Sequence, residues 1–140
     1  MNIGELRAYN YLQDIGWSVD DVTHNEQYFD KDIDLVAYRG TERLTVEVKW
    51  DSRIATTGNM FIETYADLDR SKMGWFLFCE AEYIYYGDSV NQLFYVFKTS
   101  DLREFVSTHY MEERKAGDYN RKGVLKKVSQ GMLVPIKDFS

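Results

Sequence analysis

The 140-residue sequence predicts a mixed α/β (α+β) fold in which helices flank a mixed central β-sheet. Apolar residues recur at helical spacing near the start of the chain and again after its middle. Short β-branched or aromatic runs of strand length precede and follow the second of these segments. This order is typical of a sheet with helices packed on its faces. We expect residues 1–140 to form a single domain, because this length supports one core.

The composition indicates a folded chain without a membrane span. Hydrophobic residues make up 44% and aromatic residues 16% of the sequence, which argues against disorder. The longest apolar runs, Trp75–Cys79 and Leu93–Phe97, are five residues each, far shorter than a transmembrane helix. No secretory signal is visible. Cys79 is the single cysteine, so an intramolecular disulfide is excluded. We expect a cytoplasmic protein.

The first segments are a helix and a strand. Residues 3–15 have apolar side chains near helical spacing, and Gly16 follows as a stop signal. Residues 17–22 are expected to form the first strand. The two histidines, His24 and His109, have no cysteine or histidine at metal-ligand spacing, so neither is expected to bind metal.

A β-hairpin over residues 33–50 is the centre of the prediction. An apolar strand over residues 33–38 leads to a tight turn in which Gly40 can adopt positive φ. Residues 44–50 return as a strand rich in β-branched side chains. Because side chains alternate along a strand, Glu47 and Lys49 share one face of it. A charged pair in so apolar a strand is costly to bury unless something compensates it.

The second half of the chain is expected to continue the sheet. Residues 56–59 form a turn-rich cluster, and a strand resumes at residue 60. Aromatic strands are expected over residues 75–78, 83–86 and 93–97. Ser100 is then a suitable N-cap for the second helix. This helix is expected to end at residues 117–120.

The chain is expected to close with a second hairpin. Its strands would be residues 124–128 and 132–136, with the turn at Gln130-Gly131. Pro135 predicts an edge position for the last strand, because proline cannot donate a ladder hydrogen bond.

Asp34, followed after the first hairpin by Glu47-Val48-Lys49, resembles the active-site motif of the PD-(D/E)xK nuclease superfamily. That superfamily includes restriction endonucleases, Holliday-junction resolvases and many phage nucleases. Ile33 stands where the motif often has proline. Asp30 and Asp32 share the strand parity of Asp34, so the choice of aspartate stays open. The resemblance covers roughly residues 3–86 and implies a restriction-endonuclease-like core.

The resemblance also implies Mg²⁺-dependent hydrolysis of DNA, with Mn²⁺ as a substitute. Asp34, Glu47 and the carbonyl oxygen of Val48 would hold one or two ions, which prefer oxygen ligands. Lys49 would orient or deprotonate the attacking water, or neutralise the scissile phosphate. Glu5 would assist at the metal, as in resolvase-like members. Alternatively, Glu5 is a solvated first-turn residue stabilised by the helix dipole.

The segment after the motif also resembles phage-type nucleases, which would bring Asn59 or Glu63 near the site. The alternative is a turn and an edge strand with an exposed glutamate. The resemblance implies a DNA substrate, structure-selective as in resolvases or phage nucleases. A homodimer is expected by analogy with enzymes that make two cuts.

The net charge of −6 opposes DNA binding at long range. Residues 114–127 nevertheless contain six basic residues and one acidic residue, a local charge of +5 that leaves −11 for the rest. We expect phosphate contacts from Arg121, Lys122, Lys126 and Lys127. Two other functions remain open: a degenerate nuclease fold that only binds a protein or nucleic acid, and a sheet face with an exposed Glu47–Lys49 ion pair.

Overall fold

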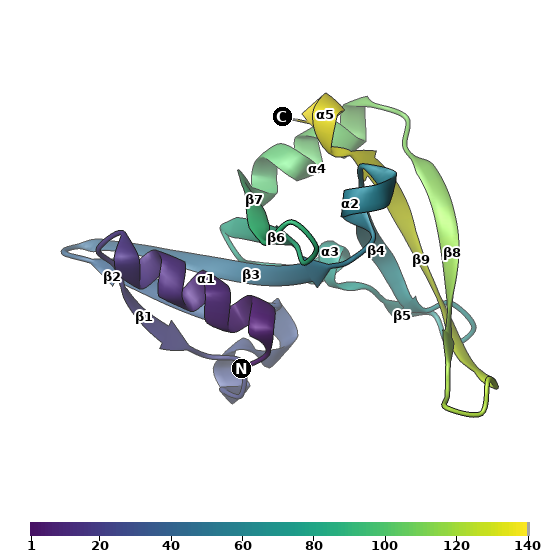
Figure 1. Cartoon of the computed structure of the whole chain (residues 1–140), viewed down its shortest axis with the longest axis horizontal. Helices are drawn as coiled ribbons and strands as arrows, with labels where there is room; N and C mark the ends of the chain where they lie inside the picture. Colours follow the sequence, from purple (N-terminus) through teal and green to yellow (C-terminus); the bar gives the residue numbers. More distant parts are fainter. Residues whose placement is uncertain (140) are drawn as a thin grey trace.

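The computed structural model describes residues 1–139, which form two β-sheets set side by side with helices around them (Figure 1). Sheet A contains, in spatial order, β1 (Ser18–Asp21), β2 (Leu35–Arg39), β3 (Glu42–Asp51), β6 (Tyr83–Asp88) and β7 (Leu93–Lys98). Its strands are antiparallel except for the parallel pair β3–β6. The predicted mixed sheet with flanking helices is confirmed.

Sheet B is entirely antiparallel and was not predicted as a separate sheet. It contains, in spatial order, β5 (Lys72–Met73), β4 (Asn59–Asp67), β9 (Leu125–Pro135) and β8 (Glu112–Tyr119). Strands β4 and β5 belong to the long connection between the parallel strands β3 and β6, so this connection leaves sheet A and returns to it.

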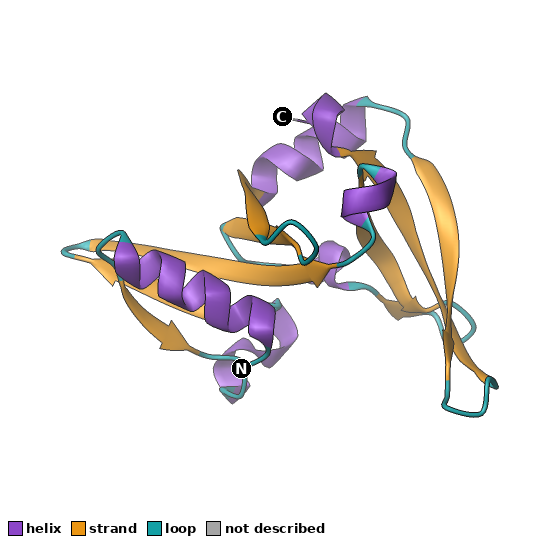
Figure 2. Ribbon diagram, in the orientation of Figure 1, coloured by secondary structure: helices purple, strands orange, loops and turns teal. Residues whose placement is uncertain are grey.

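Helices flank sheet A and the upper end of sheet B, whereas no helix within residues 1–139 lies over the far end of strands β8 and β9 (Figure 2). The helices are α1 (Ile3–Asp14), the 3-10 helix η1 (Glu26–Lys31), α2 (Ile54–Thr57), α3 (Trp75–Phe78), α4 (Thr99–Thr108) and α5 (Ile136–Phe139). Helix α1 lies along the strands of sheet A (Figure 2). No helix within residues 1–139 is long and apolar enough to cross a membrane.

Two cores lie on opposite faces of sheet A. The first packs beneath α1 and includes Ala8, Leu12, Leu35, Val46 and Val48. The second joins sheet A to sheet B, α3 and α4, and includes Ile84, Met60, Ile62, Trp75 and Leu102. The second face of β3 is therefore turned toward sheet B, and any polar group on it must be paired or reach solvent.

The prediction of an aromatic strand over residues 75–78 is wrong, because this segment is the short helix α3. Trp75 and Phe76 are buried and the next two residues are exposed, whereas a half-buried strand would alternate. Gly74 caps the helix at a close approach: a Cβ atom there would lie 2.6 Å from the carbonyl oxygen of Glu63. Four apolar residues are too few for periodicity to separate helix from strand.

The expected closing hairpin is also wrong. Strand β9 runs without a break through Gly131 and pairs with β8, whereas the turn lies over residues 120–124. Gly131 is paired on both sides, with Glu63 and Arg114, and a Cβ atom at this position would lie 2.7 Å from the ring of Phe61, so the strand requires glycine there. The edge position predicted from Pro135 fails too, since β9 lies between β4 and β8. Pro135 is the last residue of its strand, where a missing ladder donor is tolerated.

Candidate active site

Glu47 and Lys49 lie on the face of β3 that is turned away from α1. Val46 and Val48 pack in the core beneath α1, as the alternation of strand side chains requires. The Nζ atom of Lys49 lies 3.1 Å from Oε1 of Glu47, and these side chains are 29% and 5% exposed. The lysine is therefore the partner of a buried carboxylate and the half of the pair that reaches solvent.

Asp34 lies immediately before β2 and is bonded to β3 through both backbone and side chain. Its amide donates to the carbonyl oxygen of Val46 at 2.9 Å. Its carboxylate oxygen Oδ2 accepts a hydrogen bond of 2.8 Å from the amide of Val48. Because Val48 sits between Glu47 and Lys49, this bond fixes the aspartate against the charged pair. The structure thus brings Asp34, Glu47 and Lys49 together.

The carboxyl groups in this cluster hold protons more tightly than usual. Burial raises the pKa of Glu47 to about 9; Lys49 opposes the shift, and the charges of Asp34 and Asp32 add to it. Burial likewise raises the pKa of Asp34 to about 6, against the hydrogen bond from Val48. Like charges in low dielectric favour the neutral form or a bound cation. The cluster is therefore suited to a positively charged ligand.

Asp32 is a further acidic residue of this region. It has left-handed backbone geometry, with φ 51°, and its carbonyl oxygen accepts a 3.6 Å contact from the thiol of Cys79. Burial raises the pKa of its carboxyl group, and its buried Oδ2 atom has no hydrogen-bond partner within residues 1–139. Of the aspartates that the sequence left open, Asp34 bonds to Val48, whereas Asp30 and Asp32 line the neighbouring cleft.

Glu5 occupies the first turn of α1 and has a capping role. Its amide donates to Oδ1 of Asn2 at 2.8 Å, and the Asn2 side chain donates to Oε1 of Glu5 at 2.7 Å. The charge of Glu5 also raises the pKa of Asp34. The residue is therefore a helix-capping glutamate that lies within electrostatic reach of the Asp34 carboxylate, and its role at a metal stays a prediction.

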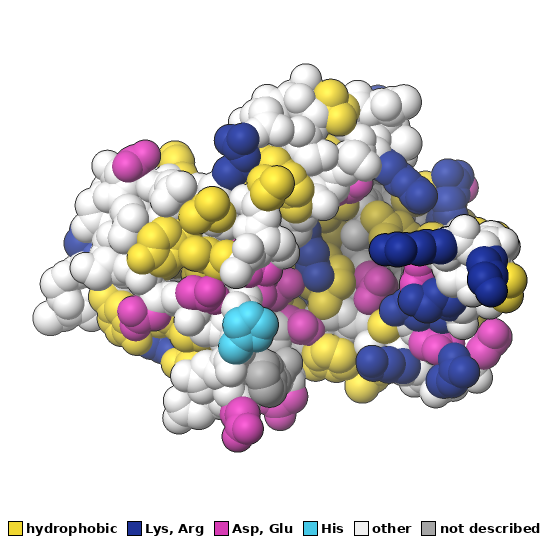
Figure 3. Space-filling view, turned by 60° about the horizontal axis from the view of Figure 1, so that its bottom comes forward, with side chains coloured by type: hydrophobic (Ala, Val, Ile, Leu, Met, Phe, Trp, Pro, Cys, Tyr) yellow, Lys and Arg dark blue, Asp and Glu magenta, His cyan; other side chains and the backbone are white. Residues whose placement is uncertain are grey.

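A cleft of about 1240 Å³ lies beside this cluster, between sheets A and B. Figure 3 shows acidic side chains in the hollow and basic side chains along the strands β8 and β9 that border it. Lys49 lines the cleft, whereas Glu47 lies buried behind it. The basic side chains at the cleft are Lys49, Arg53, Lys72, Arg114 and Lys115, and the acidic ones are Asp30, Asp32, Asp51 and Glu63.

Trp75 of α3 is a second contact of the Lys49 ammonium group. The Nζ atom of Lys49 lies 4.6 Å from the centre of the Trp75 ring, within the range of a cation–π interaction. Trp75 is itself buried and lines the cleft. Sequence reasoning missed this residue, because nothing distinguishes it among the many aromatic residues of the chain.

Asn59 and Glu63 of β4 both line the cleft. Glu63 is half-buried, and burial raises the pKa of its carboxyl group while Lys49, Lys127 and a hydrogen bond from the Trp75 amide oppose the shift. The sequence left open whether either residue approaches the site. The structure places Glu63 within the electrostatic reach of Lys49, on the opposite wall of the cleft.

A tyrosine hydroxyl ties the two walls of the cleft together. Tyr86 of β6 donates to Oδ2 of Asp51 at 2.6 Å and accepts a hydrogen bond of 2.9 Å from the amide of Phe61. The bond to Phe61 crosses from sheet A to sheet B. Because Tyr86 is opposite Lys49 in the β3–β6 register, this link fixes sheet B close to the charged cluster.

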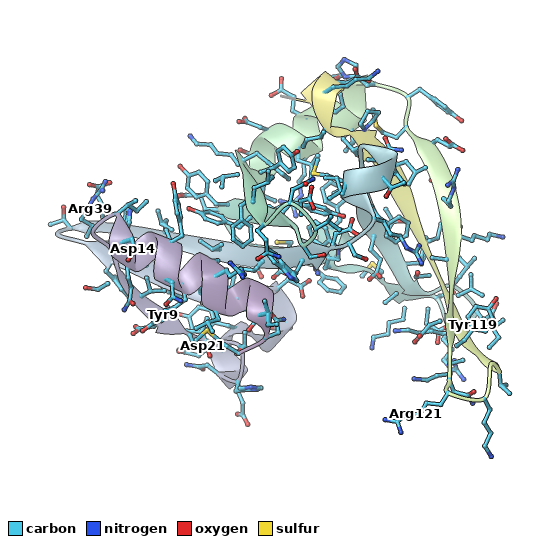
Figure 4. All side chains as sticks on the ribbon, viewed as in Figure 1. Tyr9, Asp14, Asp21, Arg39, Tyr119 and Arg121 are labelled. Atoms are coloured by element: carbon cyan, nitrogen blue, oxygen red, sulfur yellow. The ribbon has the colours of Figure 1, made fainter. Side chains whose placement is uncertain are left out.

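The four basic residues predicted to contact DNA all lie on the β8–β9 hairpin, but at different positions along it. Arg121 and Lys122 are in the turn at its tip (Figure 4). The Nζ atom of Lys126 lies 3.9 Å from Oδ2 of Asp118. The positive charge of Lys127 opposes the rise in the pKa of Glu63. None of the four lines the described part of the cleft, whereas Arg114 and Lys115 do. Arg114 and Lys115 belong to the same basic run, residues 114–127, so the sequence did contain a pattern from which they could have been proposed as contacts.

The donor set fits a magnesium ion that keeps several water ligands. Glu47 is 4% exposed, and its Oε2 atom has no hydrogen-bond partner among the described residues, which is costly unless a cation or proton completes the site. Within residues 1–139, no three His, Cys, Asp or Glu side chains are arranged to hold a metal by themselves. Magnesium commonly binds one or two carboxylates together with waters and phosphate oxygens.

The fold resembles that of a bacterial homing endonuclease of known structure. The two structures superpose with a TM-score of 0.50 at 17% sequence identity, covering 94% of this chain and 74% of the other. No protein-family model matches the sequence. A search of curated proteins returns no match. The comparison shows a shared fold.

Proposed function

We propose that the chain is a metal-dependent nuclease that hydrolyses phosphodiester bonds of DNA at the cleft between its sheets. The observation that carries the proposal is the buried Glu47, paired with Lys49 at 3.1 Å and left with one unpartnered oxygen. Asp34 lies against the same strand through Val48. The fold shared with a homing endonuclease supports the proposal, because it belongs to a protein that acts on DNA.

Asp34, Glu47 and the carbonyl oxygen of Val48 would hold Mg²⁺, or Mn²⁺ in its place. When bound, the ion supplies charge that polarises the phosphate and lowers the pKa of water. The ammonium group of Lys49 faces the cleft and can neutralise a phosphate oxygen or orient a water molecule there. Both Trp75 and Glu47 contact that ammonium, and preorganised charge of this kind stabilises a transition state.

Cleavage of DNA with and without divalent metal tests the proposal. Supercoiled, linear, single-stranded and branched substrates are incubated with Mg²⁺ or Mn²⁺, and EDTA controls are run in parallel. Metal-dependent strand cleavage is expected on at least one substrate, and Lys49→Met should reduce it without unfolding the chain. A preparation that binds DNA yet cuts none of the four substrates is a binding protein, and the proposal then fails.

A further inference from the structure

The ribbon formed by β8 and the first half of β9, residues 112–129, extends beyond both cores (Figure 1). Its base, Glu112–Lys115, pairs with the part of β9 that β4 also joins, whereas residues 116–129 pair in the ladder only with each other. All residues of β8 are exposed except the half-buried Ala116, and β9 is exposed over residues 125–127. Exposed apolar side chains lie near its tip: Tyr119, Val124 and Leu125 are 61%, 58% and 48% exposed. Sheet B supports residues 116–129 only at their base, and a two-stranded hairpin alone is at best marginally stable in water, so a ligand could add packing here.

Cations lie on both faces of the ribbon and at its tip. Arg114 is paired with Gly131 in the ladder, and Asp118 with Lys127, so alternation puts Arg114 and Lys127 on one face. Lys115 lies on the other face. Arg114 and Lys126 approach acidic neighbours. Among residues 1–139 the remaining ribbon cations form no salt bridge; they are Lys115, Arg121, Lys122 and Lys127.

The ribbon meets the cleft along an edge. Four consecutive residues of β8, Arg114–Gly117, all line the cleft, although neighbouring strand residues point to opposite faces. Consecutive residues of a strand can all line a cleft where the edge of the strand, with its backbone, borders that cleft. Strand β8 is the free edge of sheet B. An edge with cations on both sides suits a ligand that places phosphates on either side of it.

We propose that the two-stranded end of the ribbon, residues 116–129, lies in the major groove of double-stranded DNA while the phosphate backbone enters the cleft at Lys49. The major groove is about 12 Å wide and admits a two-stranded β-ribbon, whereas the minor groove is about 6 Å wide and proteins that bind in it frequently bend or kink the duplex. Phosphates flank the groove on both sides and match Lys115 and Lys127. The exposed Tyr119 and Leu125 are suited to apolar contact with thymine methyl groups. This inference rests on the proposed function and names its substrate as a duplex.

The test measures binding of labelled DNA in EDTA, so that cleavage plays no part. Four probes share one A·T-containing sequence: the plain duplex, the duplex with glucosylated hydroxymethylcytosine filling the major groove, the duplex with netropsin filling the minor groove, and the single strand. We expect the sugar to weaken binding about tenfold or more, and netropsin to change it by less than about twofold. Equal effects of the two blocks, or a single strand bound as tightly as the duplex, would overturn the inference.

Two variants assign the effect to the ribbon. Tyr119→Ser with Leu125→Ser changes only exposed side chains, and we expect it to bind the plain duplex more weakly and to discriminate less between plain and glucosylated duplexes. Arg39→Gln with Lys98→Gln removes two charges away from the cleft and should discriminate as the wild type does. Cleavage of the plain duplex with Mg²⁺ is measured on the same preparations. Cleavage without groove discrimination overturns only this inference, whereas discrimination without cleavage overturns only the proposed function.

Discussion

The amide of Val48 donates a hydrogen bond of 2.8 Å to the carboxylate of Asp34. This bond joins an acidic side chain that lies just before β2 to the backbone of β3, at the position between Glu47 and Lys49. The same hydrogen bond therefore stabilises the contact between Asp34 and β3 and holds the Asp34 carboxylate beside the Glu47–Lys49 pair. Its two roles can be separated by substitution.

Asp34→Asn keeps an oxygen for the Val48 amide, whereas Asp34→Ala leaves that amide without a partner. We expect Asp34→Ala to lose about 1–3 kcal/mol of unfolding free energy and Asp34→Asn to lose clearly less. In the wild type, Mg²⁺ at a hundredfold excess over its Kd should add about 2.7 kcal/mol. Both variants should lose that increment. Urea denaturation at fixed ionic strength measures this, and an undiminished metal effect in Asp34→Asn would rule out Asp34 as a ligand.

The raised pKa of Glu47 predicts how stability depends on pH without metal. The folded state binds the Glu47 proton up to about pH 9, whereas the unfolded chain releases it near its ordinary pKa of about 4.3. Its contribution to stability is therefore complete below the unfolded pKa and is lost as the pH rises through about 9. The raised pKa of Asp34 also makes stability fall as the pH rises, but only up to about pH 6.

In EDTA, the unfolding free energy should thus fall between pH 6 and 9 by at most about 1.4 kcal/mol per pH unit for this group. Glu47→Gln should flatten that decline, because its amide does not titrate. Chemical denaturation at several pH values makes the comparison. Parallel pH profiles for the two proteins would mean that Glu47 is ionised at neutral pH in the folded state.

The contact between Lys49 and Trp75 predicts a catalytic effect at a residue that touches no phosphate. Trp75→Leu removes the ring and should slow single-turnover cleavage by about threefold to thirtyfold, the equivalent of a cation–π interaction. Trp75→Phe should recover part of the rate. Trp17→Leu is the matched control, because the Trp17 ring stacks on Arg39, 4.3 Å from its guanidinium carbon, far from the cleft. Equal losses in Trp17→Leu and Trp75→Leu would point to stability alone.

Phosphate contacts by the ribbon should appear in the salt dependence of DNA binding. Lys115→Gln with Lys127→Gln should reduce the slope of log K against log salt by about 0.9 for each lost contact. The control, Arg39→Gln with Lys98→Gln, has the same net charge and should keep the wild-type slope. Fluorescence anisotropy in EDTA over a range of salt concentrations provides the slopes. Identical slopes in all three proteins would place the DNA elsewhere.

The sequence allowed prediction of the parts of the fold that local patterns determine. The hairpin around Gly40 and the shared face of Glu47 and Lys49 follow from turn chemistry and strand alternation, and the structure confirms both. Sheet B was missed because its pairing joins residues far apart in sequence, such as Phe61 and Leu133. No local pattern encodes that pairing.

The candidate site shows the same division. Asp34, Glu47 and Lys49 could be named from a motif, because their spacing follows from one hairpin. Trp75 could not, since it reaches Lys49 only through the packing of α3 against β4 in the core between the two sheets. The cleft required the relative placement of two sheets. The basic run was visible in the sequence, but which of its residues border the cleft depended on the register of β8 and β9.

Single-turnover cleavage by Glu47→Gln tests the central claim most directly. The amide keeps the shape of the side chain and removes the charge that would bind metal, so the fold should be retained. With Mg²⁺ in excess, we expect the rate to fall at least about a hundredfold, while DNA binding in EDTA stays within about twofold of wild type. Wild-type cleavage by Glu47→Gln, at the same metal dependence, would contradict the assignment of this carboxylate to a catalytic metal site.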